Sequence, residues 1–217
     1  APYPRTEEEM RRQLAEYYAM ITHLDDEIGK IMEALKRNQQ WENTIIILTG
    51  DNGLAIGSHG LMGKQNLYEE SIRIPLIFAG PGIPKGQVRD QFVYLLDIYP
   101  TLCDILGISI PPTVQGKSFE KVFGEETSVT RETLYFAYND LIRGVKDRRY
   151  KLIQYRNVSN CTQLFDLQNN PDETENLAEE EACRLTRLRL EQILSEYKDE
   201  WGDEAHPMGR RYWLKES

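Results

Sequence analysis

The chain has 217 residues and a formal net charge of −9; 28% of its residues are charged and 40% are hydrophobic. This length can bury one large core or two small ones, and the composition is typical of a globular protein. Acidic residues concentrate between positions 171 and 204, there is no basic stripe, and no apolar run reaches about 18 residues. We therefore expect neither nucleic-acid binding nor a membrane span. The three cysteines show no C-x-x-C spacing and assign no disulfide.

The first half of the chain has an α/β pattern. Residues 6–38 predict a long helix, because Thr6 is a suitable N-cap and apolar residues recur at spacings of three and four. This apolar face predicts packing against a sheet, with a coiled coil as the alternative. Residues 43–48 and 75–79 are short apolar runs that predict buried parallel strands. Residues 97–106 predict a further helix.

From about residue 133 the pattern changes to short strands. Four runs separated by turn signals predict an antiparallel sheet: residues 133–138, 141–145, 150–155 and 163–167. Residues 180–198 then predict a helix that turns four side chains inward, namely Leu185, Leu188, Ile193 and Leu194. We predict two domains, residues 1–120 and residues 121–217.

An acidic and an amide side chain, Asp51 and Asn52, directly follow the first predicted strand. Ligands of open α/β sheets bind beyond the carboxyl ends of the strands. The two side chains offer only oxygen ligands, which suit Ca²⁺ or Mg²⁺, and Gly50 and Gly53 allow the backbone to approach a ligand closely. The alternative is a plain turn, for which Asp-Asn-Gly is a favourable sequence.

A glycine-rich loop follows at residues 57–64 and ends in Lys64. A lysine ammonium donates up to three hydrogen bonds and suits a sulfate or phosphate oxygen. His59 can donate to an anion or act as an acid or base. A solvated lysine and a loop histidine are the ordinary alternatives, but the convergence of these features favours a metal and oxyanion site at residues 49–64. Tyr68 and the residues after it predict a helix start with a packing role, and Arg143 is predicted to anchor a loop.

Three segments, residues 49–53, 59–64 and 68–75, together resemble a metal-and-sulfate motif of the type I sulfatases, in the alkaline phosphatase superfamily. Further segments resemble the same family in the same order: residues 17–35, 80–84, 96–102, 111–118 and 150–177. The resemblance implies the C-terminal part of an alkaline-phosphatase-like α/β sandwich, followed by a small antiparallel sheet with a C-terminal helix.

The resemblance also implies roles for four residues. Asp51 and Asn52 would be ligands of one Ca²⁺, with Mg²⁺ less favoured. Lys64 would be catalytic and bind a sulfate oxygen, and His59 would contact the sulfate or the sugar of the substrate. The family makes its formylglycine nucleophile in a C/S-x-P-x-R motif, which this chain lacks. We therefore expect an N-terminal half of the same sulfatase to supply the formylglycine, and the chain alone to be inactive and to expose apolar surface.

We weigh three functions. The first is hydrolysis of a sulfate ester, of a carbohydrate or another sulfated small molecule. The second is a phosphodiesterase or phosphonate hydrolase of the same superfamily; Asn52, where many diesterases carry His, favours the sulfatase. The third is a non-catalytic binding or structural chain. The family implies a periplasmic, secreted or lysosomal location, and we expect the targeting segment to lie outside this chain.

Overall fold

The computed structural model describes residues 5–124, 128–156 and 161–214. Contacts divide the chain into two compact units. Unit 1 comprises Ala1–Lys64, Glu70–Asp90 and Tyr94–Ser128, and unit 2 comprises Gln65–Glu69, Gln91–Val93 and Val129–Ser217. Two short early segments thus belong with the later residues. The division into domains after residue 120 stays a prediction.

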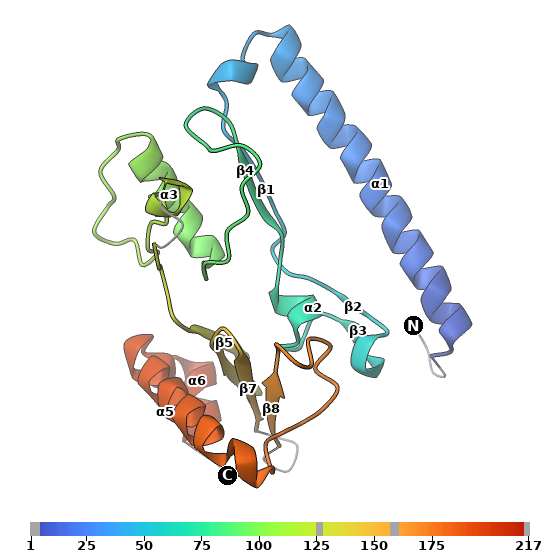
Figure 1. The fold of residues 1–217 in the computed structure, drawn as a ribbon, viewed down its shortest axis with the longest axis vertical. Coiled ribbons are helices and arrows are strands. Elements are labelled where there is room, and N and C mark those ends of the chain that lie inside the picture. The colour runs from blue at the N-terminus through green and yellow to red at the C-terminus, as the bar shows by residue number, and fades with distance from the viewer. Residues whose placement is uncertain (1–4, 125–127, 157–160, 215–217) are drawn as a thin grey trace. The chain divides into compact units, whose positions relative to one another are not determined.

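Unit 1 begins with a long helix, α1 (Glu7–Arg37), the blue helix of Figure 1. The Thr6 side chain caps it by accepting a hydrogen bond from the Glu9 backbone N–H at 3.3 Å. Acidic residues occupy its first turn and basic residues its last turn, which complements the helix dipole. The predicted helix and its N-cap are therefore confirmed.

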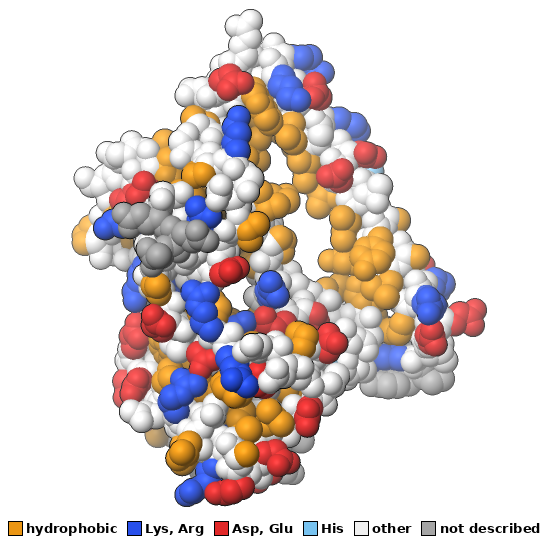
Figure 2. Space-filling model, viewed as in Figure 1, with side chains coloured by type: hydrophobic (Ala, Val, Ile, Leu, Met, Phe, Trp, Pro, Cys, Tyr) orange, Lys and Arg blue, Asp and Glu red, His pale blue; other side chains and the backbone are white. Residues whose placement is uncertain are grey.

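The apolar face of α1 is exposed within this chain. None of its residues, all of which the structure describes, is buried; Ile31 is 63% exposed and Leu24 is 57% exposed. Figure 2 shows hydrophobic side chains gathered along this helix. The expected burial of the helix against a sheet is therefore not found, whereas the expectation of exposed apolar surface is confirmed.

Two strands of unit 1, β1 (Ile46–Thr49) and β4 (Leu76–Ala79), pair antiparallel, with Ile46 opposite Ala79. The prediction of buried parallel strands is wrong on both points, since Leu48 is 40% exposed and Ile77 is 53% exposed. An apolar run indicates that both faces of a strand are suited to burial, but it does not indicate the direction of the partner strand.

Two further helices of unit 1 are α3 (Ile98–Ile105), which confirms the prediction for this region, and α4 (Lys121–Gly124). The buried Asp97 carboxylate joins two segments at the start of α3. It accepts hydrogen bonds from the backbone N–H groups of Tyr94 at 2.7 Å and Lys117 at 2.8 Å. A short helix, α2 (Glu69–Ile72), confirms the helix start predicted near Tyr68.

Unit 2 is built on a four-stranded antiparallel meander in the order β5-β6-β7-β8, as the sequence predicts. Its strands and helices are β5 (Leu134–Tyr138), β6 (Ile142–Lys146), β7 (Tyr150–Tyr155), β8 (Thr162–Asp166), α5 (Arg184–Glu200) and α6 (Pro207–Trp213). Each connection joins neighbouring strands, which is the simplest topology for runs separated by turn signals.

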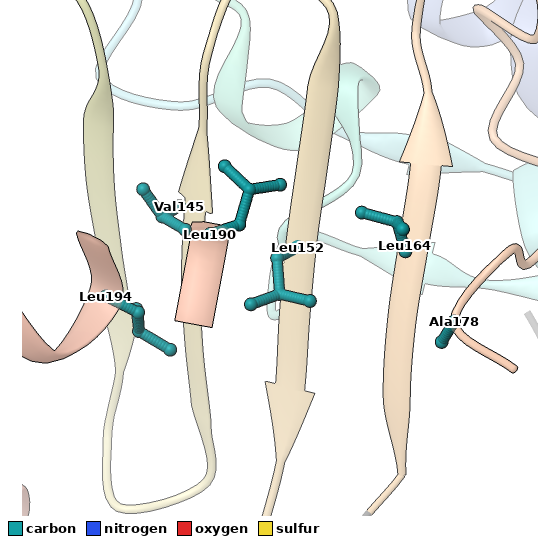
Figure 3. Packing of buried hydrophobic residues seen from close by; sticks show 6 residues of the cluster. All are labelled: Val145, Leu152, Leu164, Ala178, Leu190 and Leu194. Atoms are coloured by element: carbon teal, nitrogen blue, oxygen red, sulfur yellow. The ribbon is translucent and has the colours of Figure 1, made fainter. Parts of the chain in front are cut away.

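The core of unit 2 lies between this sheet and α5. Figure 3 shows Leu190 and Leu194 of α5 beside the strand residues, and the buried cluster comprises Val145, Leu152, Leu164, Ala178, Leu190 and Leu194. Burial of each leucine side chain contributes about 1.5–3 kcal/mol.

The helix face predicted for this region is partly wrong. Leu194 is buried and Ile193 packs against the cluster, but Leu185 is 77% exposed and Leu188 is 45% exposed. At about 100° per residue, Leu188 lies roughly 200° around the helix from Leu190. The face of α5 that carries Leu190 and Leu194 therefore packs on the strands, whereas Leu185 and Leu188 point away from the strands.

Candidate metal and oxyanion site

A small hairpin in unit 1 brings two predicted site residues together. Its strands β2 (Ala55–Ile56) and β3 (Met62–Gly63) pair antiparallel, with Ala55 opposite Gly63. Because the hairpin reverses the chain, Lys64 after β3 lies beside Asp51 before β2, and Nζ of Lys64 is 3.3 Å from Oδ2 of Asp51. The structure thus places the predicted anion-binding lysine beside the predicted metal ligand.

The tip of this hairpin carries His59. The Gly57 N–H donates to the Leu61 carbonyl at 2.9 Å, and Gly57 has a φ of +96°, a conformation that favours glycine. His59 itself has a φ of +53°, which is uncommon for a residue with a side chain. Its Nε2 lies 3.9 Å from Oε2 of Glu70. The structure therefore identifies a carboxylate neighbour of His59 that the sequence did not indicate.

Asp51 and Asn52 both expose oxygen atoms suited to a hard cation. The Asp51 side chain is 86% exposed, and the hydrogen bond and charge of Lys64 hold the pKa of Asp51 below its ordinary value. The Asn52 amide nitrogen donates to the Gly53 carbonyl at 3.1 Å, which leaves the amide oxygen as the group that can bind a cation. The two side chains fit Ca²⁺ in chemistry but supply fewer ligands than the six to eight that this ion takes.

Gly53 holds this turn against a neighbouring segment of unit 1. Its N–H donates to the Ser71 carbonyl at 2.9 Å, and a Cβ at this position would lie 2.0 Å from the Glu70 carbonyl oxygen. The sequence predicted that Gly53 permits close approach to a ligand; the close approach that the structure shows is to the backbone of the chain itself. Only glycine fits this contact.

A group of four charged residues in unit 2, three of them buried, was not predicted from the sequence. We call it the Glu69 cluster; it consists of Glu69, Lys146, Lys151 and Glu173. The one signal in the sequence is Lys151, a lysine inside a strand-like run of apolar residues. Nothing local indicates its partners, because Glu69 lies 82 residues earlier in the chain.

Two family models match the chain. Residues 57–200 match the model described as N-sulphoglucosamine sulphohydrolase, C-terminal, and residues 1–108 match the model described as Sulfatase. A choline-sulfatase of Rhizobium meliloti is 35% identical over 181 residues, which are 80% of this chain and 35% of that protein.

Two solved structures are similar to the chain. One is a protein in complex with its substrate, D-glucosamine-2-N,6-O-disulfate; it has a TM-score of 0.84 and 26% identity, and the match covers 93% of this chain and 43% of that one. The other is a phosphonate monoester hydrolase from Silicibacter pomeroyi, with a TM-score of 0.81 and 25% identity, covering 90% of this chain and 42% of that one.

These comparisons confirm the predicted fold class, part of an alkaline-phosphatase-like α/β sandwich followed by a small antiparallel sheet and a C-terminal helix. The chain spans less than half of the length of each relative named above. Among the residues that the structure describes, no helix combines the length and the apolar character that a membrane crossing requires. Because one family model matches most of its residues, the chain belongs to the sulfatase family.

Proposed function

We propose that this chain is the C-terminal part of an enzyme that hydrolyses a sulfate ester, and that Asp51, Asn52 and Lys64 belong to its active site. The observation that supports this proposal best is the contact of 3.3 Å between Lys64 and Asp51, formed by a hairpin within the residues that the Sulfatase model matches. An ammonium group beside a carboxylate that would hold a cation would provide positive charge for an anionic ester.

In this proposal, Asp51 and Asn52 would hold a Ca²⁺ ion through their side-chain oxygens. The bound ion would supply positive charge to the sulfate oxygens. Two side chains do not complete the coordination of Ca²⁺, so we assign the other ligands to the N-terminal half of the same protein. We assign the formylglycine to that half as well, because its motif does not occur in this sequence.

Lys64 would bind a sulfate oxygen and offset the negative charge that grows as the ester bond breaks. Its side chain is 52% exposed, so it can exchange one hydrogen bond with Asp51 for one with a bound sulfate. His59 would contact the sulfate or the adjoining sugar from the tip of the same hairpin.

We propose a sulfated carbohydrate as the substrate. The description of the family model, N-sulphoglucosamine sulphohydrolase, and the glucosamine disulfate bound in the similar structure support this class. The choline-sulfatase relative supports a smaller sulfated molecule as the alternative. The periplasmic, secreted or lysosomal location that we propose rests on the family resemblance.

The decisive experiment compares Lys64→Ala with Lys85→Ala in the complete protein, meaning this chain together with its N-terminal half. Loss of one charge-stabilising donor lowers turnover by about 10²–10³-fold. We expect such a loss in kcat/KM for nitrophenyl sulfate in Lys64→Ala and little change in Lys85→Ala, which removes an exposed lysine of unit 1. Unchanged kinetics in Lys64→Ala would refute its role.

A phosphonate monoester hydrolase is the second candidate, because a structure of that activity is similar to this chain. The same complete protein assayed on nitrophenyl sulfate and on a nitrophenyl phosphonate ester separates the two. We expect the larger kcat/KM on the sulfate; a larger value on the phosphonate would support the second candidate. Turnover of neither ester would support a non-catalytic chain.

A further inference from the structure

The five residues after Lys64, Gln65–Glu69, are part of unit 2. They include Leu67 and Tyr68, which are 4% and 8% exposed. A Cβ on Gly144 of β6 would come within 2.8 Å of a Leu67 methyl carbon, so a glycine there makes room for this side chain. The backbone that leaves the proposed lysine is therefore packed on the four-stranded sheet.

Tyr68 adds a second attachment, this time to β8. Its ring centroid lies 5.9 Å from that of Phe165, and its hydroxyl group donates to Gln163 Oε1 at 3.2 Å. The contact combines aromatic packing with a directed hydrogen bond, so it restrains both the position and the rotation of the ring. The segment is thus held to the sheet by more than one residue.

Glu69 makes the third attachment through its side chain and its backbone. Its carboxylate Oε1 lies 2.8 Å from Nζ of Lys146 and 3.1 Å from Nζ of Lys151. Lys151 is fully buried and also pairs with Glu173, whose carboxylate accepts the Glu69 backbone N–H at 2.7 Å. Two carboxylates and two ammonium groups balance in formal charge, and each of them restrains the others.

Moving the Glu69 carboxylate away from Lys146 and Lys151 would leave charged groups without their partners. Burial alone raises the pKa of Glu69, but the charges of Lys151 and Lys146 outweigh it and hold this pKa below its ordinary value. A buried charge that loses its partner is strongly destabilising, whereas a fully paired one adds little stability. Burial works against the charged forms of Lys146 and Glu173, since it lowers the pKa of Lys146 and raises the pKa of Glu173. We therefore expect the Glu69 cluster to restrain geometry more than it adds to the free energy of unfolding.

The segment that begins at Gln65 is continuous with both parts of the proposed site. Lys64 directly precedes it. At its other end, in unit 1, the Ser71 carbonyl accepts the Gly53 N–H, which holds the turn that carries Asp51 and Asn52. The residues that flank this segment in the chain are therefore the proposed lysine and the stretch of backbone that holds the turn.

We propose that Glu69 is a positioning residue for the sulfatase site: held by Lys146, Lys151 and Glu173, it fixes the backbone that carries Lys64. This inference rests on the proposed function. Glu69 acts through Lys64 and does not itself touch the substrate. A displacement of about 1 Å at a reacting centre can cost on the order of 10²-fold in rate.

The test is a double-mutant cycle in the complete protein, with kcat/KM for nitrophenyl sulfate as the measured quantity. We expect Glu69→Gln to lower kcat/KM by about 10–100-fold at a temperature where circular dichroism shows a folded enzyme. In a Lys64→Ala background, the same change should lower it by less than about threefold, because the group that Glu69 positions is absent.

Two further variants keep the test decisive. Asp203→Asn perturbs another buried ion pair of unit 2, in which Nε of Arg143 on β6 lies 2.6 Å from Asp203. It should lower the Tm and leave kcat/KM unchanged. If Glu69→Gln does not fold, Lys146→Gln removes one of the two lysines and leaves Lys151 in place; we expect a smaller loss in the same direction.

Unchanged kcat/KM in folded Glu69→Gln, or in Lys146→Gln where it takes the place of that variant, would overturn the inference while leaving the proposed function intact. An equal loss with and without Lys64 would also overturn it, because that result indicates a general structural role. Lys64→Ala with normal turnover would instead overturn the proposed role of Lys64, and this inference with it.

Discussion

The change Asp203→Ala is predicted to be among the more damaging single substitutions in unit 2. The Asp203 carboxylate accepts hydrogen bonds from Arg143 Nε at 2.6 Å and Nη2 at 3.1 Å, from the Tyr135 hydroxyl at 2.8 Å and from Trp213 Nε1 at 2.6 Å. It thereby joins β5, β6 and α6 at one point. The Arg143 side chain is 1% exposed, and it also donates to the Asn139 carbonyl at 2.7 Å, in the turn between β5 and β6.

The magnitude follows from what Arg143 would retain. Removing one partner of a buried ion pair costs about 3–5 kcal/mol. Arg143 would still donate to the carbonyls of Asn139 at 2.7 Å and Ile142 at 2.9 Å, and its guanidinium would still lie over the Tyr212 ring at 4.5 Å. We therefore expect the lower end, about 3 kcal/mol, which corresponds to a fall in Tm of roughly 6–12 °C for a chain of this size.

Urea unfolding followed by far-ultraviolet circular dichroism measures this loss as a lower midpoint at constant m value. Asp199→Ala is the matched control: Asp199 also pairs with a basic residue, Lys198 at 3.4 Å, but its side chain is 76% exposed. An exposed pair contributes about 0–1 kcal/mol. If Asp203→Ala cost less than about 1 kcal/mol, or no more than Asp199→Ala, the reasoning from burial would be refuted.

Two other predictions concern acid stability and the turn of the proposed site. Burial raises the pKa of Asp203, but hydrogen bonds from Arg143 and other donors outweigh this effect, so the pKa of Asp203 lies below its ordinary value. The ionised carboxylate therefore stabilises the folded protein at pH values above the unfolded-state pKa. This stabilisation is lost as the pH falls through the folded-state pKa. The difference in unfolding free energy between the unmodified protein and Asp203→Ala should therefore narrow below about pH 4, and a constant difference in urea titrations would contradict this. Gly53→Ala would place a Cβ 2.0 Å from the Glu70 carbonyl oxygen, so we expect the complete protein to lose turnover of nitrophenyl sulfate. Gly124→Ala, whose Cβ meets no atom of the described residues within 4 Å, should not change turnover, and equal activities of the two variants would show that the turn tolerates the displacement.

Much of the local structure could be read from the sequence. The cap at Thr6, the apolar spacing of α1 and the four runs of the meander each depend on neighbours within a few residues, and the structure confirms them. The residue types of the proposed site were also visible, because Asp51, Asn52 and Lys64 lie within one short segment. Their roles stay predictions, although the structure brings Lys64 to Asp51.

What only the tertiary structure decided depends on residues that meet across long stretches of chain. The direction of β4 beside β1 depends on which strands the fold pairs. The exposure of Leu185 and of the apolar face of α1 depends on which other elements pack against those helices. The Glu69 cluster is the clearest case. Lys146 lies 77 residues from Glu69, and no local pattern could pair them. Periodicity and capping act over one or two turns, whereas burial and ion pairing act wherever the fold brings side chains together. The sequence by itself therefore determined where most helices and strands lie and which residues are candidates for the site, but not how strands pair or which side chains are buried together.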